Sequence, residues 1–248
     1  GIGRFDDLAF TAKTFYERAL IDRLLPRLIH RAYAGLNEAT APGRDVGPEA
    51  AERIETTLMV LLRLAGQDQG EPKPEIVQAW LRDQLAAESY SAAEIVSAER
   101  HFAAAAAVMA ERPRRTEFPS HAVERARAIL RDVGPAARGY AAVLRAGEAA
   151  RLPPWRIADH GGNETHRVFA RKSQARLTEG APGLFTKSGF YAVVAPQVLL
   201  AAQSIRDNAW ILDQSAGQPP ISPTLEKDIF NLYFKEYARR WEELLDDL

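Results

Sequence analysis

Apolar residues recur every three to five positions over the first part of the chain, and this spacing predicts amphipathic helices. The first helix runs from Phe5 to about Leu36 and is interrupted at Pro26, where it either kinks or gives way to a second helix. Short polar connections separate the later helices, so we expect neighbours to pack side by side. These helices are predicted over residues 48–64, 74–87, 91–111, 120–134 and 135–150.

Residues typical of helix starts support this division. Ser91 is followed three positions later by Glu94, the spacing of a capping box, which satisfies backbone donors at a helix start. Thr186 is a good N-cap for a helix that continues to about Ile205. Ser222, with Pro223 at the first helical position, predicts the start of the last helix, whose apolar stripe continues to the end of the chain.

The pattern changes after about residue 150, where the helical period is lost up to Gly183. This region contains Pro153-Pro154 and Gly161-Gly162, and residues 167–171 alternate as a short strand does. The predicted fold class is therefore mainly α, a multi-helix bundle with a small β-hairpin element around residues 166–183. We expect an N-terminal helical lobe over 1–150 and a C-terminal helical lobe with the hairpin over 151–248, unless the two form one continuous domain.

The composition of the 248 residues is that of a globular protein: 46% are hydrophobic and 26% are charged. The chain has 32 Lys and Arg against 33 Asp and Glu. Such a balance gives no overall field that attracts nucleic acid, so no nucleic-acid partner is expected. Cysteine is absent, which excludes disulfides, thiolate metal sites and cysteine nucleophiles.

Membrane attachment is not expected within these residues. The apolar pattern predicts no run that approaches the ~20 residues needed to cross a bilayer, and the chain opens at Gly1 without a leader pattern. We expect the chain to be cut from a longer protein, with any membrane anchor in segments outside it.

Residues with potential chemistry lie mainly in the glycine-rich region. His160-Gly161-Gly162 suggests an oxyanion loop, but the Gly-x-Ser-x-Gly elbow that must accompany it is missing. His160 and His166 flank Glu164 at a spacing of six, whereas a zinc helix needs histidines four apart. We therefore expect no metal site, no cofactor and no catalytic residue here. The alternative is a helical hydrolase or transferase with an active-site loop at 155–183.

Acidic pairs occur at residues 6–7, 242–243 and 246–247, but adjacent residues on one helix point in different directions, so they are interpreted as solvated faces. No phosphate-binding loop is present. The aromatic residues Tyr233, Tyr237 and Trp241 share one helix face, which favours core packing over a protein–protein contact. The turn before Thr186 is interpreted as a structural clamp.

Several blocks of the sequence, in order, resemble one known family. They are YERALIDRLLPRL at 16–28, a tryptophan helix at 75–85, VFARKS at 168–173, EGAPGLFTKSGFY at 179–191, DNAWIL at 207–212 and LYFKEYARRWEELL at 232–245. Together they are similar to the periplasmic helical part of the type VI secretion TssM/IcmF family, and the similarity covers nearly the whole chain.

The resemblance implies a structural subunit without chemistry. The family is an inner-membrane protein that assembles with TssL and the lipoprotein TssJ into a trans-envelope complex, which docks a contractile tail. The chain would be a periplasmic scaffold domain that contacts TssL and other TssM copies, while TssJ would bind mainly a downstream region absent here. The family's transmembrane helices and NTPase-like region would lie upstream. An unrelated cytoplasmic adaptor is a further alternative.

The resemblance and the aromatic pattern together give one set of candidate residues for an interaction or structural motif. The set combines the turn before the helix start at residue 186 with the aromatic face of the last helix. Its members are Gly183, Leu184, Phe185, Thr186, Tyr233, Tyr237 and Trp241.

Overall fold

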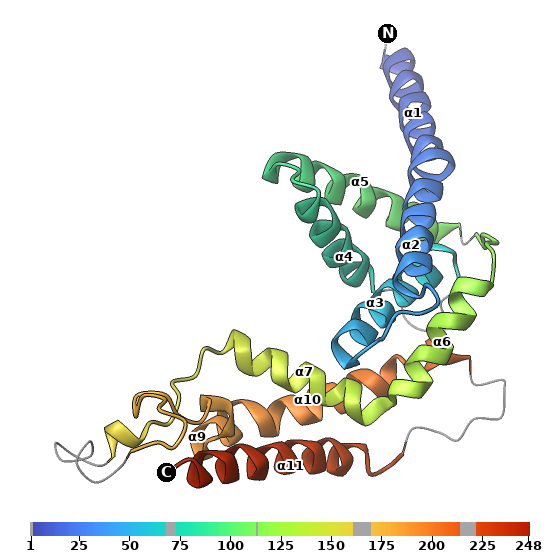
Figure 1. Ribbon diagram of the computed structural model, residues 1–248. Coiled ribbons are helices and arrows are strands. Elements are labelled where there is room, and N and C mark those ends of the chain that lie inside the picture. The colour runs from blue at the N-terminus through green and yellow to red at the C-terminus, as the bar shows by residue number, and fades with distance from the viewer. Residues whose placement is uncertain (1, 68–72, 113, 161–169, 214–221) are drawn as a thin grey trace. The chain divides into compact units, whose positions relative to one another are not determined.

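The computed structural model describes residues 2–67, 73–112, 114–160, 170–213 and 222–248. Over these ranges the chain is mainly helical and contains no strand (Figure 1). It forms two compact units. Unit 1 comprises Gly1–Asp45 and Arg53–Ile129, and unit 2 comprises Val46–Glu52 and Leu130–Leu248. The division into lobes of 1–150 and 151–248 stays a prediction about how the chain folds.

Unit 1 is built from helices of one to six turns. They are α1 (Ile2–Ala19), the π-helical turn η1 (Leu20–Leu24), α2 (Leu25–Ala39), most of α3 (Pro48–Leu64), α4 (Pro74–Ala87), α5 (Ala92–Glu111) and most of α6 (His121–Val133). Helix α4 packs against α5. Fully buried leucines of α3 and the buried Trp80 of α4 contribute to the core. Burial of such apolar faces is what stabilises short helices.

The turn η1 explains how the first helix passes Pro26. A proline inside a helix lacks an N–H, and its ring conflicts with the carbonyl four residues earlier, here that of Asp22. The helix widens instead: the N–H of Leu25 donates to the carbonyl of Leu20, five residues back. A second π-turn, η4 (Phe190–Val194), precedes Pro196 in the same way. The chain therefore continues through both prolines without ending the helix.

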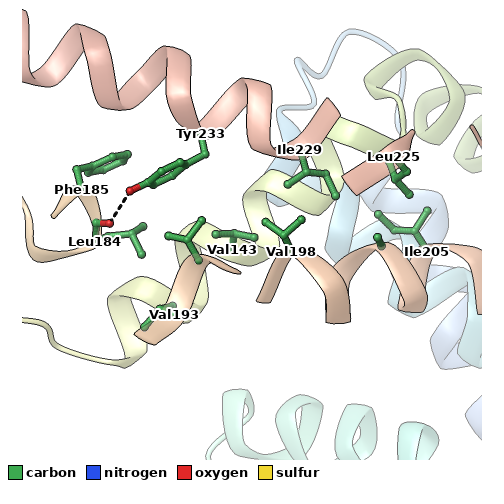
Figure 2. Packing of buried hydrophobic residues seen from close by; sticks show 11 residues of the cluster. Val143, Leu184, Phe185, Val193, Val198, Ile205, Leu225, Ile229 and Tyr233 are labelled. Atoms are coloured by element: carbon green, nitrogen blue, oxygen red, sulfur yellow. Dashed lines mark hydrogen bonds between the residues drawn. The ribbon is translucent and has the colours of Figure 1, made fainter. Parts of the chain in front are cut away.

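Unit 2 is organised around three helices that contact one another, α7 (Pro135–Ala149), α10 (Ala195–Asp207) and α11 (Leu225–Asp246). Between them lie the short elements η2 (Ile157–Asp159), η3 (Gly183–Phe185), α9 (Lys187–Gly189), η4 and η5 (Ala209–Leu212). Figure 2 shows their shared core, in which Val143 of α7, Val198 of α10 and Ile229 of α11 are almost fully buried. Gly139 of α7 lets Ile229 approach closely, because an added Cβ would lie 2.5 Å from its Cδ1.

The predicted β-hairpin over 166–183 is not seen. Residues 170–183 form turns, with only an isolated antiparallel bridge between Trp155 and Ala181, and residues 166–169 lie outside the described ranges. The reason is competition for hydrogen bonds. The backbone N–H of Lys172 donates to the carbonyl of Asp247 at the end of α11, and that of Ala158 to the carbonyl of Leu177, so no ladder forms.

One expectation about membranes needs correction. The continuous stretch Lys187–Asp207, which comprises α9, η4 and α10, is long and apolar enough to cross a membrane by length and composition. In the structure its buried face includes Val194, Val198 and Ala202, which pack in the core of unit 2. The stretch therefore contributes one face to this core.

Candidate functional site

The turn at 183–186 and the aromatic face of α11, both predicted from the sequence, meet in the structure. The hydroxyl of Tyr233 donates to the main-chain carbonyl of Leu184 at 3.0 Å (Figure 2). The indole N–H of Trp241 donates to the carbonyl of Phe185 at 2.8 Å. We call this arrangement the clasp: residues 183–186 on one side and Tyr233, Tyr237 and Trp241 on the other.

The sequence forces the turn of the clasp into a tight shape. Thr186 Oγ1 accepts a hydrogen bond from the N–H of Gly189 at 3.0 Å and donates to the carbonyl of Gly183 at 2.7 Å. Thr186 is thus the N-cap that the sequence predicts. Both glycines are required by space: an added Cβ on Gly189 would lie 2.0 Å from the Gly183 oxygen. No side chain fits there unless the backbone moves.

Aromatic stacking completes the clasp. The rings of Phe185 and Tyr233 stack with centroids 5.5 Å apart and an interplanar angle of 8°. The Arg240 guanidinium lies 4.8 Å from the centroid of the Phe185 ring, a cation–π geometry. Tyr237 lies between the other two aromatic residues of α11, 6.1 Å from each. The structure thus brings all seven predicted residues together.

Burial sets the protonation of the tyrosines in this region. Burial raises the pKa of Tyr233 to about 12, with a smaller contribution from the neighbouring Tyr237. Burial also raises the pKa of Tyr140, on α7, to about 12, assisted by the charge of Glu236. Both phenols are therefore neutral at physiological pH. Tyr233 acts as a hydrogen-bond donor to the backbone, and its pKa is far from that of a general base.

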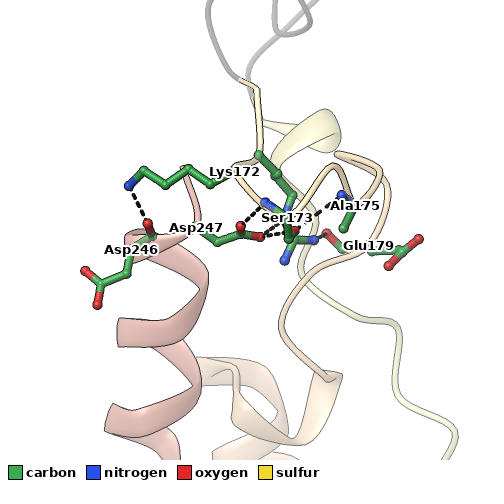
Figure 3. A network of polar contacts seen from close by, with 7 residues as sticks. Lys172, Ser173, Ala175, Glu179, Asp246 and Asp247 are labelled. Carbon is green, nitrogen blue, oxygen red and sulfur yellow. Dashed lines mark hydrogen bonds and ion pairs between the residues drawn. The ribbon is translucent and has the colours of Figure 1, made fainter.

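A second set of contacts joins the end of α11 to residues 171–181, which we call the strap (Figure 3). The Asp247 carboxylate accepts hydrogen bonds from the Ser173 N–H, the Ser173 hydroxyl and Arg171 Nε, each at 2.6 Å. Lys172 Nζ donates to the carbonyl of Asp246 at 2.5 Å. The hydrogen bonds from Ser173 are the largest cause of the lowered pKa of Asp247, and Arg171 adds to it.

Helices α10 and α11 are joined by a bidentate ion pair. The two terminal nitrogens of Arg206 donate to the two carboxylate oxygens of Glu226 at 2.5 and 2.6 Å. The hydrogen bonds from Arg206 lower the pKa of Glu226 to about 2. This fork geometry fixes the orientation of both side chains. It is a structural contact between two helices of unit 2.

Residues considered for chemistry do not assemble into a reactive group in the part of the chain that the structure describes. His160 stacks on Trp155, with ring centroids 5.0 Å apart and planes 13° apart. Glu164 and His166 lie outside the described ranges. Among the described residues no group of three His, Asp or Glu could hold a metal ion. The interpretation of the acidic pairs as solvated faces is wrong for Asp247, whose side chain is only 15% exposed and binds the strap, whereas Glu243 is 60% exposed and pairs with Arg239.

Sequence reasoning missed two parts of this region. The strap was not predicted because Asp247 and Ser173 are 74 positions apart, and no local pattern links them. The small cluster around Leu244 was also missed, in which Trp155 packs against Trp241 with ring centroids 5.1 Å apart. The available signal was the density of aromatic and glycine residues in these two stretches, which predicts close packing without naming the pairs.

Comparisons with known proteins show which family the chain matches. Residues 1–248 match the model of a family described as IcmF-related: Intracellular multiplication and human macrophage-killing. One curated relative is the type VI secretion system component TssM1 of Pseudomonas aeruginosa strain PAO1. It is 33% identical over 142 residues, which are 57% of this chain and 13% of the relative. The matched part thus spans a small fraction of that protein. No solved structure matches the chain.

Proposed function

The chain belongs to the IcmF-related family, and from this we propose that it is a structural part of the membrane complex of a bacterial type VI secretion system. Its role is that of a periplasmic scaffold domain that acts through protein–protein contacts. The printed name of the relative, a type VI secretion system component, supports the assignment to this system. The match over residues 1–248 extends that support to both units.

The clasp is the observation that supports a structural role. Its polar groups are used inside the fold, because Tyr233 and Trp241 donate to backbone carbonyls and Thr186 caps a helix. A catalytic site needs polar groups that converge on a substrate. In the clasp these groups converge on the main chain instead, as expected for an element that holds a scaffold in one shape.

The proposed partners are proteins of the same complex. We expect contacts with TssL and with further copies of the same chain, whereas TssJ would bind mainly through a region outside these residues. The near balance of 32 basic and 33 acidic residues gives no reason to expect nucleic acid as a partner. Membrane anchoring would come from segments outside the 248 residues, and no cofactor is proposed.

Co-purification of the full-length protein tests this proposal. The protein is produced in its native membrane with a tag and captured after mild detergent extraction, with TssL and TssJ detected in the eluate. Replacing residues 1–248 by a flexible linker of equal length should abolish or strongly reduce the capture of TssL. Unchanged capture of both proteins by the linker variant would contradict a scaffold role for this segment.

The alternative, a hydrolase or transferase with a loop at 155–183, predicts a different outcome. It requires His160 to be available for a substrate, whereas its ring is stacked on Trp155. Under this alternative, changing His160 to Ala abolishes function and leaves the assembly of the complex intact. The scaffold proposal predicts instead that changing His160 to Ala leaves function intact, whereas changes in the clasp abolish it.

A further inference from the structure

Helix α11 carries an exposed stripe on the side opposite its buried residues. At 100° per residue, the stripe occupies a sector of about 100°. The buried residues Leu225, Ile229, Tyr233 and Leu244 lie on the other side of the helix. The members of the stripe are all exposed: Lys227, Asn231, Phe234, Lys235, Ala238, Glu242 and Leu245.

Two large apolar residues stand in this stripe. Phe234 is 49% exposed and Leu245 is 62% exposed. The ring of Phe234 packs against two other aromatic rings: its centroid lies 5.7 Å from that of Phe190 and 6.1 Å from that of Phe230. An aromatic side chain that is already fixed loses little conformational entropy on binding, which makes it a good anchor for a partner.

Charge along the stripe is ordered by sign. The N-terminal half carries Lys227 and Lys235, and the C-terminal half carries Glu242. Within the described ranges neither Lys235 nor Glu242 has an ion-pair partner. Arg239 lies between them, but its guanidinium is held by Glu236 and Glu243 of the same helix. The stripe is thus basic and aromatic at one end, and acidic with a leucine at the other.

We propose that this stripe binds the same stripe of a second copy, with the two α11 helices antiparallel. An antiparallel pair that sets Lys235 of one copy opposite Glu242 of the other also brings Phe234 near Leu245, with an offset of about 3 Å along the axis. The small Ala238 lies near the centre, where helices must approach to about 8–10 Å.

The contact is isologous, so each pairing occurs twice around a two-fold axis. This explains why one stripe carries both signs: the surface is complementary to itself. A parallel pair would set Lys235 beside Lys235 and Glu242 beside Glu242, which like-charge repulsion disfavours. The inference rests on the proposed function, which names further copies of this chain among the partners, and it adds the surface and the antiparallel geometry of that contact.

Charge reversal of the 248-residue chain tests the pairing. The variants are Lys235→Glu, Glu242→Lys, both together in one chain, and Glu148→Lys as a matched control on the exposed surface of α7. Sedimentation velocity over a concentration series gives the dimer dissociation constant. Far-ultraviolet circular dichroism and urea unfolding verify that each variant is folded.

The wild-type chain and Glu148→Lys are expected to dimerise alike, and more weakly as salt is added. Each single reversal should weaken the dimer about tenfold or more. An equimolar mixture of the two single variants should recover the wild-type affinity, since the substituted positions then face each other with opposite signs. The double variant should also recover it.

Three results would overturn the pairing: a wild-type chain that stays monomeric at all concentrations, single reversals without effect, or no recovery in the mixture. The co-purification above is a separate measurement. A failed pairing with TssL capture that depends on residues 1–248 removes only this interface. An intact dimer with TssL and TssJ capture that the linker variant retains removes the proposed function.

Discussion

Trp241 donates its indole N–H to the main-chain carbonyl of Phe185 at 2.8 Å, and this bond joins segments 56 positions apart. About two helical turns before Trp241, Tyr233 donates its hydroxyl to the main-chain carbonyl of Leu184. Helix α11 thus satisfies two consecutive carbonyls of η3 with side chains. A short 3-10 turn has few hydrogen bonds of its own, so these donors fix its position.

Removing the Tyr233 hydroxyl should destabilise the fold. Tyr233→Phe leaves the ring stacking but strips the buried carbonyl of Leu184 of its donor, and we expect the free energy of unfolding to fall by about 1–2 kcal/mol. The matched control is Tyr191→Phe, because Tyr191 is 68% exposed. Urea unfolding followed by circular dichroism measures both. Equal effects of the two changes would show that the hydroxyl of Tyr233 contributes nothing.

A methyl group at Gly189 should disrupt the clasp. The added Cβ of Gly189→Ala would meet the Gly183 oxygen at 2.0 Å, and a backbone atom cannot rotate away. Overpacking of this kind should cost about 2 kcal/mol or more. Gly35→Ala is the control, since Gly35 lies in α2 with no atom near its added Cβ. There alanine should stabilise the helix by about 0.5–1 kcal/mol.

If Gly189→Ala unfolds at the same urea concentration as the wild type, the tight turn is not required. A variant too unstable to purify is compared by limited proteolysis in extracts with Gly35→Ala, which should resist digestion.

Alkaline pH should weaken unit 2 through two buried tyrosines. The pKa of Tyr233 and that of Tyr140 are each raised to about 12, mainly by burial. Their ordinary pKa is near 10, so the unfolded chain loses these protons first. The stabilisation is therefore complete below about pH 10 and is lost as pH rises toward 12. Urea unfolding at a series of pH values measures the free energy of unfolding. Between about pH 10 and 12 it should fall less for Tyr140→Phe and for Tyr233→Phe than for the wild type.

The hydrogen bonds that hold the strap against α11 should depend on the carboxylate of Asp247. Asp247→Asn removes the charge that accepts bonds from Arg171 and Ser173, whereas Asp246 holds the strap only through its main-chain carbonyl. Hydrogen exchange of the peptide covering residues 171–178 should become faster in Asp247→Asn and stay unchanged in Asp246→Asn. Equal protection in both variants would mean that backbone contacts alone hold the strap.

Most of the helices follow from local sequence signals. The capping box at Ser91 and Glu94 is confirmed in both of its bonds, and α3 and α4 begin at Pro48 and Pro74 as predicted. The last helix begins later than expected. Thr224 is its N-cap residue, because Ser222 Oγ accepts from the Thr224 N–H instead of capping a helix at Pro223.

The remaining features depend on contacts between distant residues. Alternation at residues 167–171 predicted a strand, but it does not reveal that Asp247 competes for the neighbouring donors. Pro26 signalled an irregularity, whereas Pro196 was not singled out, and only the structure shows a π-turn before each. In the clasp the sequence indicated the participating residues, because glycines and aromatics gathered in two stretches. It did not indicate which carbonyl each donor would reach.

Secretion by living cells tests the central claim, that this segment acts by structure and contact rather than by chemistry. The chromosomal gene is replaced by three alleles of the full-length protein. One carries Gly189→Ala, one carries Gly35→Ala, and one removes the candidate chemistry by His160→Ala, Glu164→Gln and His166→Gln. Export of an effector is measured, with the amount of membrane-inserted protein as the control.

We expect the Gly35 allele and the triple allele to secrete at the wild-type level, and the Gly189 allele to lose secretion. A triple allele that is folded and inserted but secretes nothing would contradict the account and indicate catalysis in the loop at 155–183.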